Sequence, residues 1–134
     1  MVKLLKIWLL FVPFLFGCNT LYIDPVERLR GENRQNLDQL EVGLSRERVL
    51  EIMGTDPAKG IFMWVKNPFR TETLTGKSGT SYEVLYYYTQ LRERDDKITD
   101  DELTPLVFEK DILVGWGYEF LDKKVPQKPV LQRR

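Results

Sequence analysis

The chain has 134 residues, of which 20 are basic and 20 acidic, with no histidine and a single cysteine, Cys18. This length suits one domain, and the even charge balance argues against nucleic-acid binding, which usually requires a basic face. Without histidine the commonest general base and the commonest neutral metal ligand are both missing, so we expect a protein that is not an enzyme and has no cofactor or metal site.

Residues 1–17 have the layout of a secretory signal peptide. Two lysines precede an apolar run that ends at a small residue, Gly17. The run Leu15-Phe16-Gly17-Cys18 resembles the lipobox of bacterial lipoproteins, which implies cleavage before Cys18 and lipid attachment to that cysteine. Under the sorting rule of enteric bacteria, Asn19 in the next position indicates the outer membrane, with the domain facing the periplasm.

Three other interpretations of Cys18 stay open. The leader could be an ordinary signal peptide that leaves a free thiol near the start of the mature chain. It could be an uncleaved anchor, although a bilayer needs about 20 apolar residues and this run is shorter and broken by Lys6 and Pro13. It could also be a buried core helix with an incidental cysteine. Lipidation is the interpretation that we carry forward, since two or more acyl chains would anchor the domain stably.

The mature chain is expected to contain a tether, one domain and a tail. Residues 18–31 have little periodicity, which is typical of a tether between membrane and domain. The domain is expected over residues 32–122. The tail, residues 123–134, has five basic residues, no acidic one and two prolines. It predicts a disordered terminus or, alternatively, an arm for anionic lipid or an acidic partner.

The domain begins with two predicted helices. Residues 32–40 can form a short helix with Leu37 and Leu40 on one face. Ser45 is a good N-cap for a second helix that ends at Met53, and Gly54 suits a left-handed C-cap.

From Gly60 onward the hydrophobic pattern changes to that of β-strands. Strands are predicted over residues 61–65 and 82–88, and a hairpin joins 106–108 to 112–120. The fold class is therefore α+β, with two short N-terminal helices packed on one face of a three- to four-stranded antiparallel sheet. The other face would be open to solvent or a partner.

Two turns invite a functional interpretation. Gly76-Lys77-Ser78 is similar to the end of a phosphate-binding loop, but Gly76 and Gly79 fit a hairpin turn better. The acidic residues between 95 and 102 could bind calcium through their carboxylate oxygens. They lack the EF-hand spacing, however, and a solvated loop is the alternative interpretation.

Two glycines lie in the last predicted strand. Gly115 and Gly117 would leave room for an aromatic side chain of a neighbouring strand, such as Tyr87. Alternatively, one of them marks a β-bulge. Because side chains alternate along a strand, Tyr87 is expected on the outer face.

The helix pair carries a family resemblance. Its residues are Leu40, Gly43, Leu44, Ser45, Val49, Leu50, Met53, Gly54, Thr55 and Pro57. In this spacing the chain resembles the SmpA/OmlA (BamE-like) family of outer-membrane lipoproteins. Leu44 stands in place of the usual methionine, and Asp56 adds one residue before the proline.

The resemblance implies a non-enzymatic, periplasm-facing interaction or scaffold module in outer-membrane protein assembly or envelope integrity. Its partners would be envelope proteins such as the barrel-assembly machinery. The alternative is a periplasmic inhibitor or small-ligand-binding module that uses the same sheet face, and a carboxylate-based hydrolase is a minor third hypothesis. Aromatic residues and arginine favour binding hot spots, so we predict a partner-binding patch of Phe69, Arg70 and Tyr87. Nothing in the residues indicates an oligomeric state.

Overall fold

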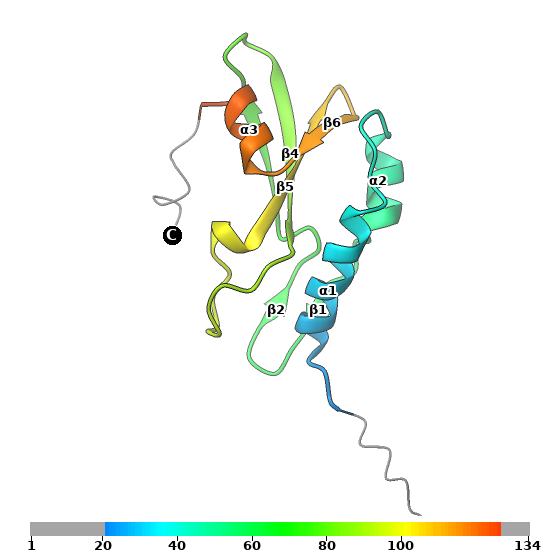
Figure 1. The fold of residues 1–134 in the computed structure, drawn as a ribbon, viewed down its shortest axis with the longest axis vertical. Helices are drawn as coiled ribbons and strands as arrows, with labels where there is room; N and C mark the ends of the chain where they lie inside the picture. Colours follow the sequence, from blue (N-terminus) through cyan, green and yellow to red (C-terminus); the bar gives the residue numbers. More distant parts are fainter. Residues whose placement is uncertain (1–20, 127–134) are drawn as a thin grey trace, which may run out of the picture.

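The computed structural model describes residues 21–126, which Figure 1 shows as a ribbon. Within this range the helices are α1 (Pro25–Leu37), α2 (Arg46–Met53) and α3 (Tyr118–Lys124). The strands are β1 (Ala58–Lys59), β2 (Trp64–Val65), β3 (Arg70–Thr75), β4 (Ser81–Tyr88), β5 (Leu103–Glu109) and β6 (Ile112–Trp116), with a 3-10 turn at Asp100–Glu102. Cys18, the predicted lipid-attachment residue, lies outside the described residues.

The main sheet has four antiparallel strands in the order β3-β4-β5-β6, and β1 pairs with β2 in a separate antiparallel hairpin. The α+β class and the antiparallel sheet are therefore confirmed. The predicted turn at Gly76 and Gly79 joins β3 to β4, although only Gly79 has a positive φ, +81°. The sequence did not predict β3, α3 or the small hairpin.

The two central strands of the main sheet, β4 and β5, are largely buried on both faces. One core cluster joins Tyr82, Val84, Tyr86 and Tyr88 of β4 to Leu121 and Val125 at the C-terminal end. The other joins Leu85 and Tyr87 of β4 to Val49 and Met53 of α2. Figure 1 shows α3 on one side of the sheet and α2 on the other. The alternation along β4 is as predicted, but the expectation of an open outer face is wrong because α2 side chains cover that face.

Helix α1 begins at Pro25, earlier than predicted. Asp24 is its N-cap, and the Asp24 side chain accepts a hydrogen bond from the backbone N–H of Val26. Proline is favoured in this first turn because its missing N–H would have no partner there. Val26, Leu29 and Asn33 form the buried stripe of the helix. Residues 25–31, at the end of the predicted tether, therefore form the first half of α1 and belong to the folded domain.

Helix α2 has the predicted ends and N-cap, although Gly54, with ψ 161°, lies outside the left-handed helical region that was expected of it. The Ser45 side chain accepts from the backbone N–H of Arg48, Val49 and Met53 are buried, and Gly54 ends the helix with φ +79°. These signals are local, which explains why they could be read from the sequence. In contrast, the predicted strand over residues 61–65 is wrong at Ile61 and Phe62, which lie in the exposed turn between β1 and β2.

The last predicted strand, 112–120, ends early. β6 stops at Trp116, Gly117 has φ +88°, and α3 begins at Tyr118. A Cβ on Gly115 would lie 2.6 Å from the ring of Phe120. An aromatic ring therefore does lie over Gly115, but it comes from α3 and not from Tyr87. The register shift between Val107 and Phe108 adds an irregularity at the same place.

The C-terminal tail begins later than predicted. Lys123 and Lys124 belong to the last turn of α3, and Val125 is buried in the core. The domain therefore extends beyond the predicted boundary at 122. Residues 127–134, on which the rest of the tail prediction falls, lie outside the described part of the chain.

Candidate functional site

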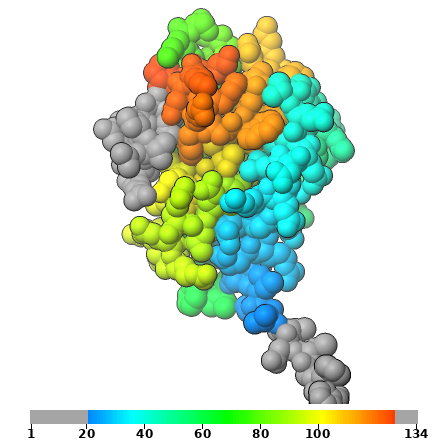
Figure 2. Space-filling model, in the orientation of Figure 1, coloured from blue at the N-terminus to red at the C-terminus, as the bar shows by residue number. Residues whose placement is uncertain are grey.

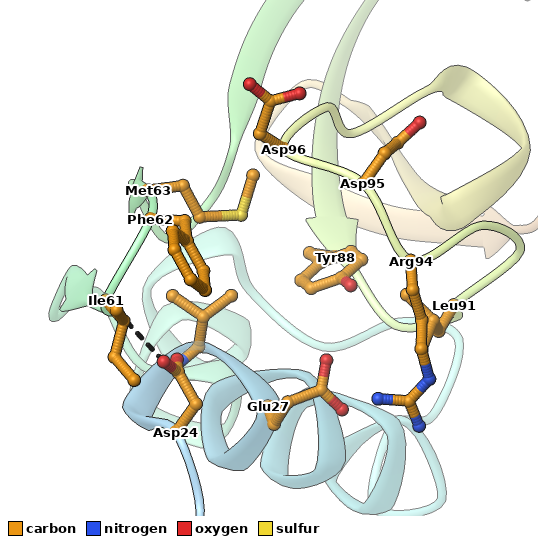
Figure 3. A pocket seen from close by; sticks show the side chains of 11 residues that line it. Asp24, Glu27, Ile61, Phe62, Met63, Tyr88, Leu91, Arg94, Asp95 and Asp96 are labelled. Atoms are coloured by element: carbon orange, nitrogen blue, oxygen red, sulfur yellow. Dashed lines mark hydrogen bonds between the residues drawn. The ribbon is translucent and has the colours of Figure 1, made fainter.

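A cleft of about 540 Å³ opens beside the start of α1. Figure 3 shows its walls, which are α1, the turn between β1 and β2, and the segment that follows β4. Val26, Phe62, Met63, Tyr88 and Leu91 contribute apolar surface. The polar residues of the cleft are Asp24, Glu27, Arg94, Asp95 and Asp96.

Asp24 joins two walls of the cleft. Its Oδ1 accepts from the backbone N–H of Val26 at 2.8 Å, and its Oδ2 accepts from the backbone N–H of Ile61 at 3.0 Å. The adjacent Gly60 permits this approach, because a Cβ there would lie 2.5 Å from Asp24 Oδ1. One carboxylate therefore caps α1 and fixes the turn of the β1–β2 hairpin against it.

Glu102 holds the third wall. This side chain is 2% exposed, and its Oε1 accepts from the backbone N–H of Arg92 at 2.9 Å. Its Oε2 accepts from the backbone N–H of Thr99 at 3.0 Å. A buried carboxylate needs such donors to replace lost water. The acidic segment considered for calcium is thus partly turned inward, where Glu102 organises the loop.

The cleft has an anionic character. Four carboxylates and one arginine line it. Burial, with a smaller contribution from the charges of Glu27, Glu102 and Asp95, raises the pKa of Tyr88 to about 12, although Arg30 acts in the opposite direction. Tyr88 therefore stays neutral at physiological pH, so it presents the cleft with a phenol and not a phenolate.

The predicted partner-binding residues do not form one patch. Phe69 is half-buried and packs against the cluster that contains Tyr86. Tyr87 is fully buried in the other cluster, and its hydroxyl donates to the backbone oxygen of Gly54 at 3.4 Å. The prediction of Tyr87 as an accessible binding residue is therefore wrong, since α2 covers it.

Arg70 is occupied within the domain. Its Nη1 donates to Asp100 Oδ1 at 2.7 Å, and its Nε lies 3.1 Å from Glu72 Oε1. Its guanidinium carbon also lies 4.1 Å from the centre of the Tyr86 ring. Burial alone would lower the pKa of Arg70, but the hydrogen bonds with Asp100 and Tyr86 and the nearby carboxylates raise it. Arg70 thus stays charged and ties β3 to the turn before β5.

Sequence reasoning missed the cleft residues. The sequence pattern predicts a strand over Ile61 and Phe62, and after residues 82–88 it singles out only the acidic residues between 95 and 102. The available signal was Gly60 at the start of the apolar run, because a glycine at such a position often marks a close approach by another segment. The contact between Asp24 and Ile61, 37 positions apart, has no local signature.

The described part of the chain offers neither a metal-binding cluster nor a membrane-spanning helix. Residues 21–126 contain no group of three or more acidic or cysteine side chains placed to hold a metal ion. In the same range no helix has both the length and the apolar character needed to cross a bilayer.

The family assignment comes from a comparison with known protein families. A model for proteins of unknown function, DUF3192, matches residues 26–123. Comparisons with curated proteins and with solved structures gave no match. The matched segment runs from the first turn of α1 to the last turn of α3, and so includes all three walls of the cleft. The chain belongs to the DUF3192 family.

Proposed function

We propose that the protein is a lipid-anchored outer-membrane lipoprotein that faces the periplasm and serves as a non-enzymatic interaction or scaffold module. The lipobox-like run that ends at Cys18 supports the anchor. The resemblance of the helix pair to the SmpA/OmlA family supports a role in outer-membrane protein assembly or envelope integrity. Other envelope proteins, with the barrel-assembly machinery as the first candidate, would be the partners.

The observation that carries the interaction role is the open apolar cleft. Ile61 and Phe62 on its edge are 64% and 86% exposed, while Met63, Tyr88 and Leu91 continue the apolar surface inward. Contiguous exposed apolar surface on a soluble domain marks interaction sites more often than chance. The acidic residues beside it favour a partner segment that combines an apolar side chain with basic neighbours.

We also infer that the two N-terminal helices pack on one face of the main sheet. Val49 and Met53 of α2 lie in the cluster on that face, and Leu37 at the end of α1 packs against the same cluster. The start of α1 differs, since its Val26 and Leu29 join the cluster on the opposite face. With that face covered, the partner surface would be the cleft and not the sheet face that the sequence suggested.

A second candidate is an inhibitor or small-ligand-binding module. The volume of the cleft, about 540 Å³, falls within the range of about 300–1,000 Å³ that is common for ligand sites. Such a module would use the same apolar walls against a soluble target or a small molecule.

The anchor is tested by the intact mass of the protein from the membrane fraction, for wild type and Cys18→Ala. We expect the wild type to begin at residue 18 and to carry acyl chains. The variant should lack the acyl mass and stay unprocessed or become soluble. A wild-type protein without acyl mass would refute the anchor.

The scaffold role is tested by affinity purification after detergent extraction. We expect envelope proteins to co-purify with wild type and to be lost with Leu91→Ser or Asp96→Lys, which alter the cleft. Glu41→Lys makes the same charge change on an exposed residue of the α1–α2 loop and should have no effect. Equal recovery with all variants would exclude the cleft, and recovery of one stoichiometric soluble enzyme would favour the second candidate.

A further inference from the structure

The exposed apolar residues of the domain gather at one end. Eight large apolar side chains of residues 21–126 are strongly exposed. Six of them belong to two segments, and they are Leu21, Tyr22, Ile23, Ile61, Phe62 and Trp64. Figure 1 shows the β1–β2 hairpin at the same end as the start of the described chain, and Figure 2 shows this end at the bottom of the molecule.

These two segments are held in a fixed relationship. The carboxylate of Asp24 bonds both the first turn of α1 and the backbone N–H of Ile61. Both of its oxygens accept hydrogen bonds, so its charge is compensated by backbone donors. The point where the chain enters the fold is therefore fastened to the tip of the hairpin.

The proposed lipid anchor is close to this end. Six peptide units separate Cys18 from Asp24, which allows a reach of at most about 20 Å at ~3.3 Å per residue. If the acyl chains of Cys18 lie in a bilayer, the hairpin tip is within this distance of the lipid headgroups. This step rests on the proposed anchor.

The side chains at the tip suit the bilayer interface. Tryptophan and tyrosine are enriched at the headgroup level, where an aromatic body and a polar group are both accommodated, and Trp64 and Tyr22 are 61% and 72% exposed. Lys59 pairs in register with Trp64, and Lys66 follows β2; both are exposed. Lysines in these positions can reach lipid phosphates while the apolar tip lies deeper.

We propose that residues 61–64, at the tip of the β1–β2 hairpin, insert together with residues 21–23 into the headgroup region of the membrane that holds Cys18. The hairpin is then a second membrane contact that sets the orientation of the domain. Trp64 does not line the cleft, whereas Ile61 and Phe62 form its edge and Met63, Tyr88 and Leu91 also line it. The cleft consequently opens next to the lipid surface, where it can receive a segment of a membrane-associated partner.

The test uses the processed, acylated chain in vesicles of phosphatidylethanolamine and phosphatidylglycerol with brominated acyl chains. The leader carries Trp8, so the processed chain has only Trp64 and Trp116. Trp116→Phe leaves Trp64 as the reporter, and Trp64→Phe leaves the half-buried Trp116 of β6 as the matched control. We expect bromolipid to quench Trp64 fluorescence by roughly half, as for a side chain at the interface, and to leave Trp116 almost unchanged.

A second pair of variants tests whether the quenching depends on the hairpin tip in particular or on any exposed apolar residue. In the Trp116→Phe background, Ile61→Ser with Phe62→Ser should remove most of the quenching of Trp64. Val42→Ser changes a residue that is 65% exposed in the α1–α2 loop, away from the hairpin, and should leave the quenching intact. Comparable quenching with and without Ile61 and Phe62 would contradict the proposal.

The outcomes distinguish this inference from the anchor on which it rests. Intact mass of the same sample reports the acyl chains. An acylated protein whose Trp64 is not quenched by bromolipid but stays open to acrylamide overturns the insertion and leaves the anchor standing. Protection of Trp64 only after membrane proteins are added also overturns it, and assigns the tip to a protein partner. A sample without acyl mass refutes the anchor and the insertion together.

Discussion

Asn33 Nδ2 donates a hydrogen bond to Asn67 Oδ1 at 2.9 Å, and both side chains are buried although they lie 34 positions apart. Asn33 Nδ2 also donates to the backbone oxygen of Tyr88 at 2.9 Å. Asn67 Nδ2 in turn donates to the backbone oxygens of Met53 and Gly54, each at 3.2 Å. Two amides thus join α1, the end of α2, the segment before β3 and the end of β4.

Asn33→Ala should destabilise the domain by about 1–3 kcal/mol, because it leaves Asn67 Oδ1 and the Tyr88 carbonyl buried without this donor. Urea unfolding measures the change. Gln35→Ala, on the exposed side of the same helix, should stay within about 0.5 kcal/mol of wild type. Equal stability of the two variants would show that the amide pair contributes nothing.

Glu102→Gln should loosen the loop that forms one wall of the cleft. The Glu102 carboxylate accepts from the backbone N–H groups of Arg92 and Thr99, and an amide cannot replace both acceptor oxygens. We expect a loss of about 1–3 kcal/mol and faster amide hydrogen exchange at residues 92–99. Glu93→Gln, an exposed neighbour, is the control, and unchanged exchange in Glu102→Gln would contradict this role.

Gly115→Ala should destabilise the contact between β6 and α3 by about 1–3 kcal/mol, as expected for an overpacked core. The added Cβ would lie 2.6 Å from the Phe120 ring. Gly31→Ala is the matched control, since nothing lies within 4 Å of a Cβ there. In the middle of α1 that change should stabilise by roughly 0.5–1 kcal/mol, so the two variants should shift the urea midpoint in opposite directions.

Stability should fall at alkaline pH because Tyr87 is buried. Burial raises the pKa of Tyr87 to about 12, against about 10 in an unfolded chain. The unfolded state therefore releases its proton first. The contribution of Tyr87 is complete below pH ~10 and is lost as the pH rises from ~10 to ~12.

The comparison of wild type with Tyr87→Phe isolates this effect. Between pH ~10 and ~11 the wild type should lose up to roughly 1.4 kcal/mol more than the variant, as measured by urea unfolding at each pH. Lysine titration is common to both chains and cancels in the difference. Parallel pH profiles would show that the Tyr87 hydroxyl ionises as easily in the folded protein as in the unfolded one.

The helix α2 and the strand β4 could be predicted because their signals are local. Ser45 and Gly54 mark the two ends of the helix, and the alternation from Tyr82 to Tyr88 specifies which side chains share a face. β6 shows the limit of such reasoning. Over Trp116, Tyr118 and Phe120 the alternation continues, yet Gly117 turns the chain into α3. Alternation over only three residues does not distinguish a strand from the start of a helix when a glycine between them allows the chain to turn.

The candidate site could not be predicted in the same way. Phe69, Arg70 and Tyr87 are residue types common in binding patches, but Arg70 is held by Asp100 and Glu72, and Tyr87 is covered by α2. The cleft depends on Asp24 meeting Ile61 and on Glu102 meeting Arg92. These contacts join loop segments, and no hydrophobic pattern in the sequence indicates which loops will meet.

The sequence by itself determined the α+β class, the capped second helix and the alternation of β4, because caps and side-chain alternation depend on neighbours in the chain. It also carries the prediction of an anchor at Cys18. Only the tertiary structure decided that β4 is buried on both faces, that Tyr87 is a core residue and that an apolar hairpin tip lies beside the start of α1. These features depend on which distant segments pack together, and packing is decided by the whole fold.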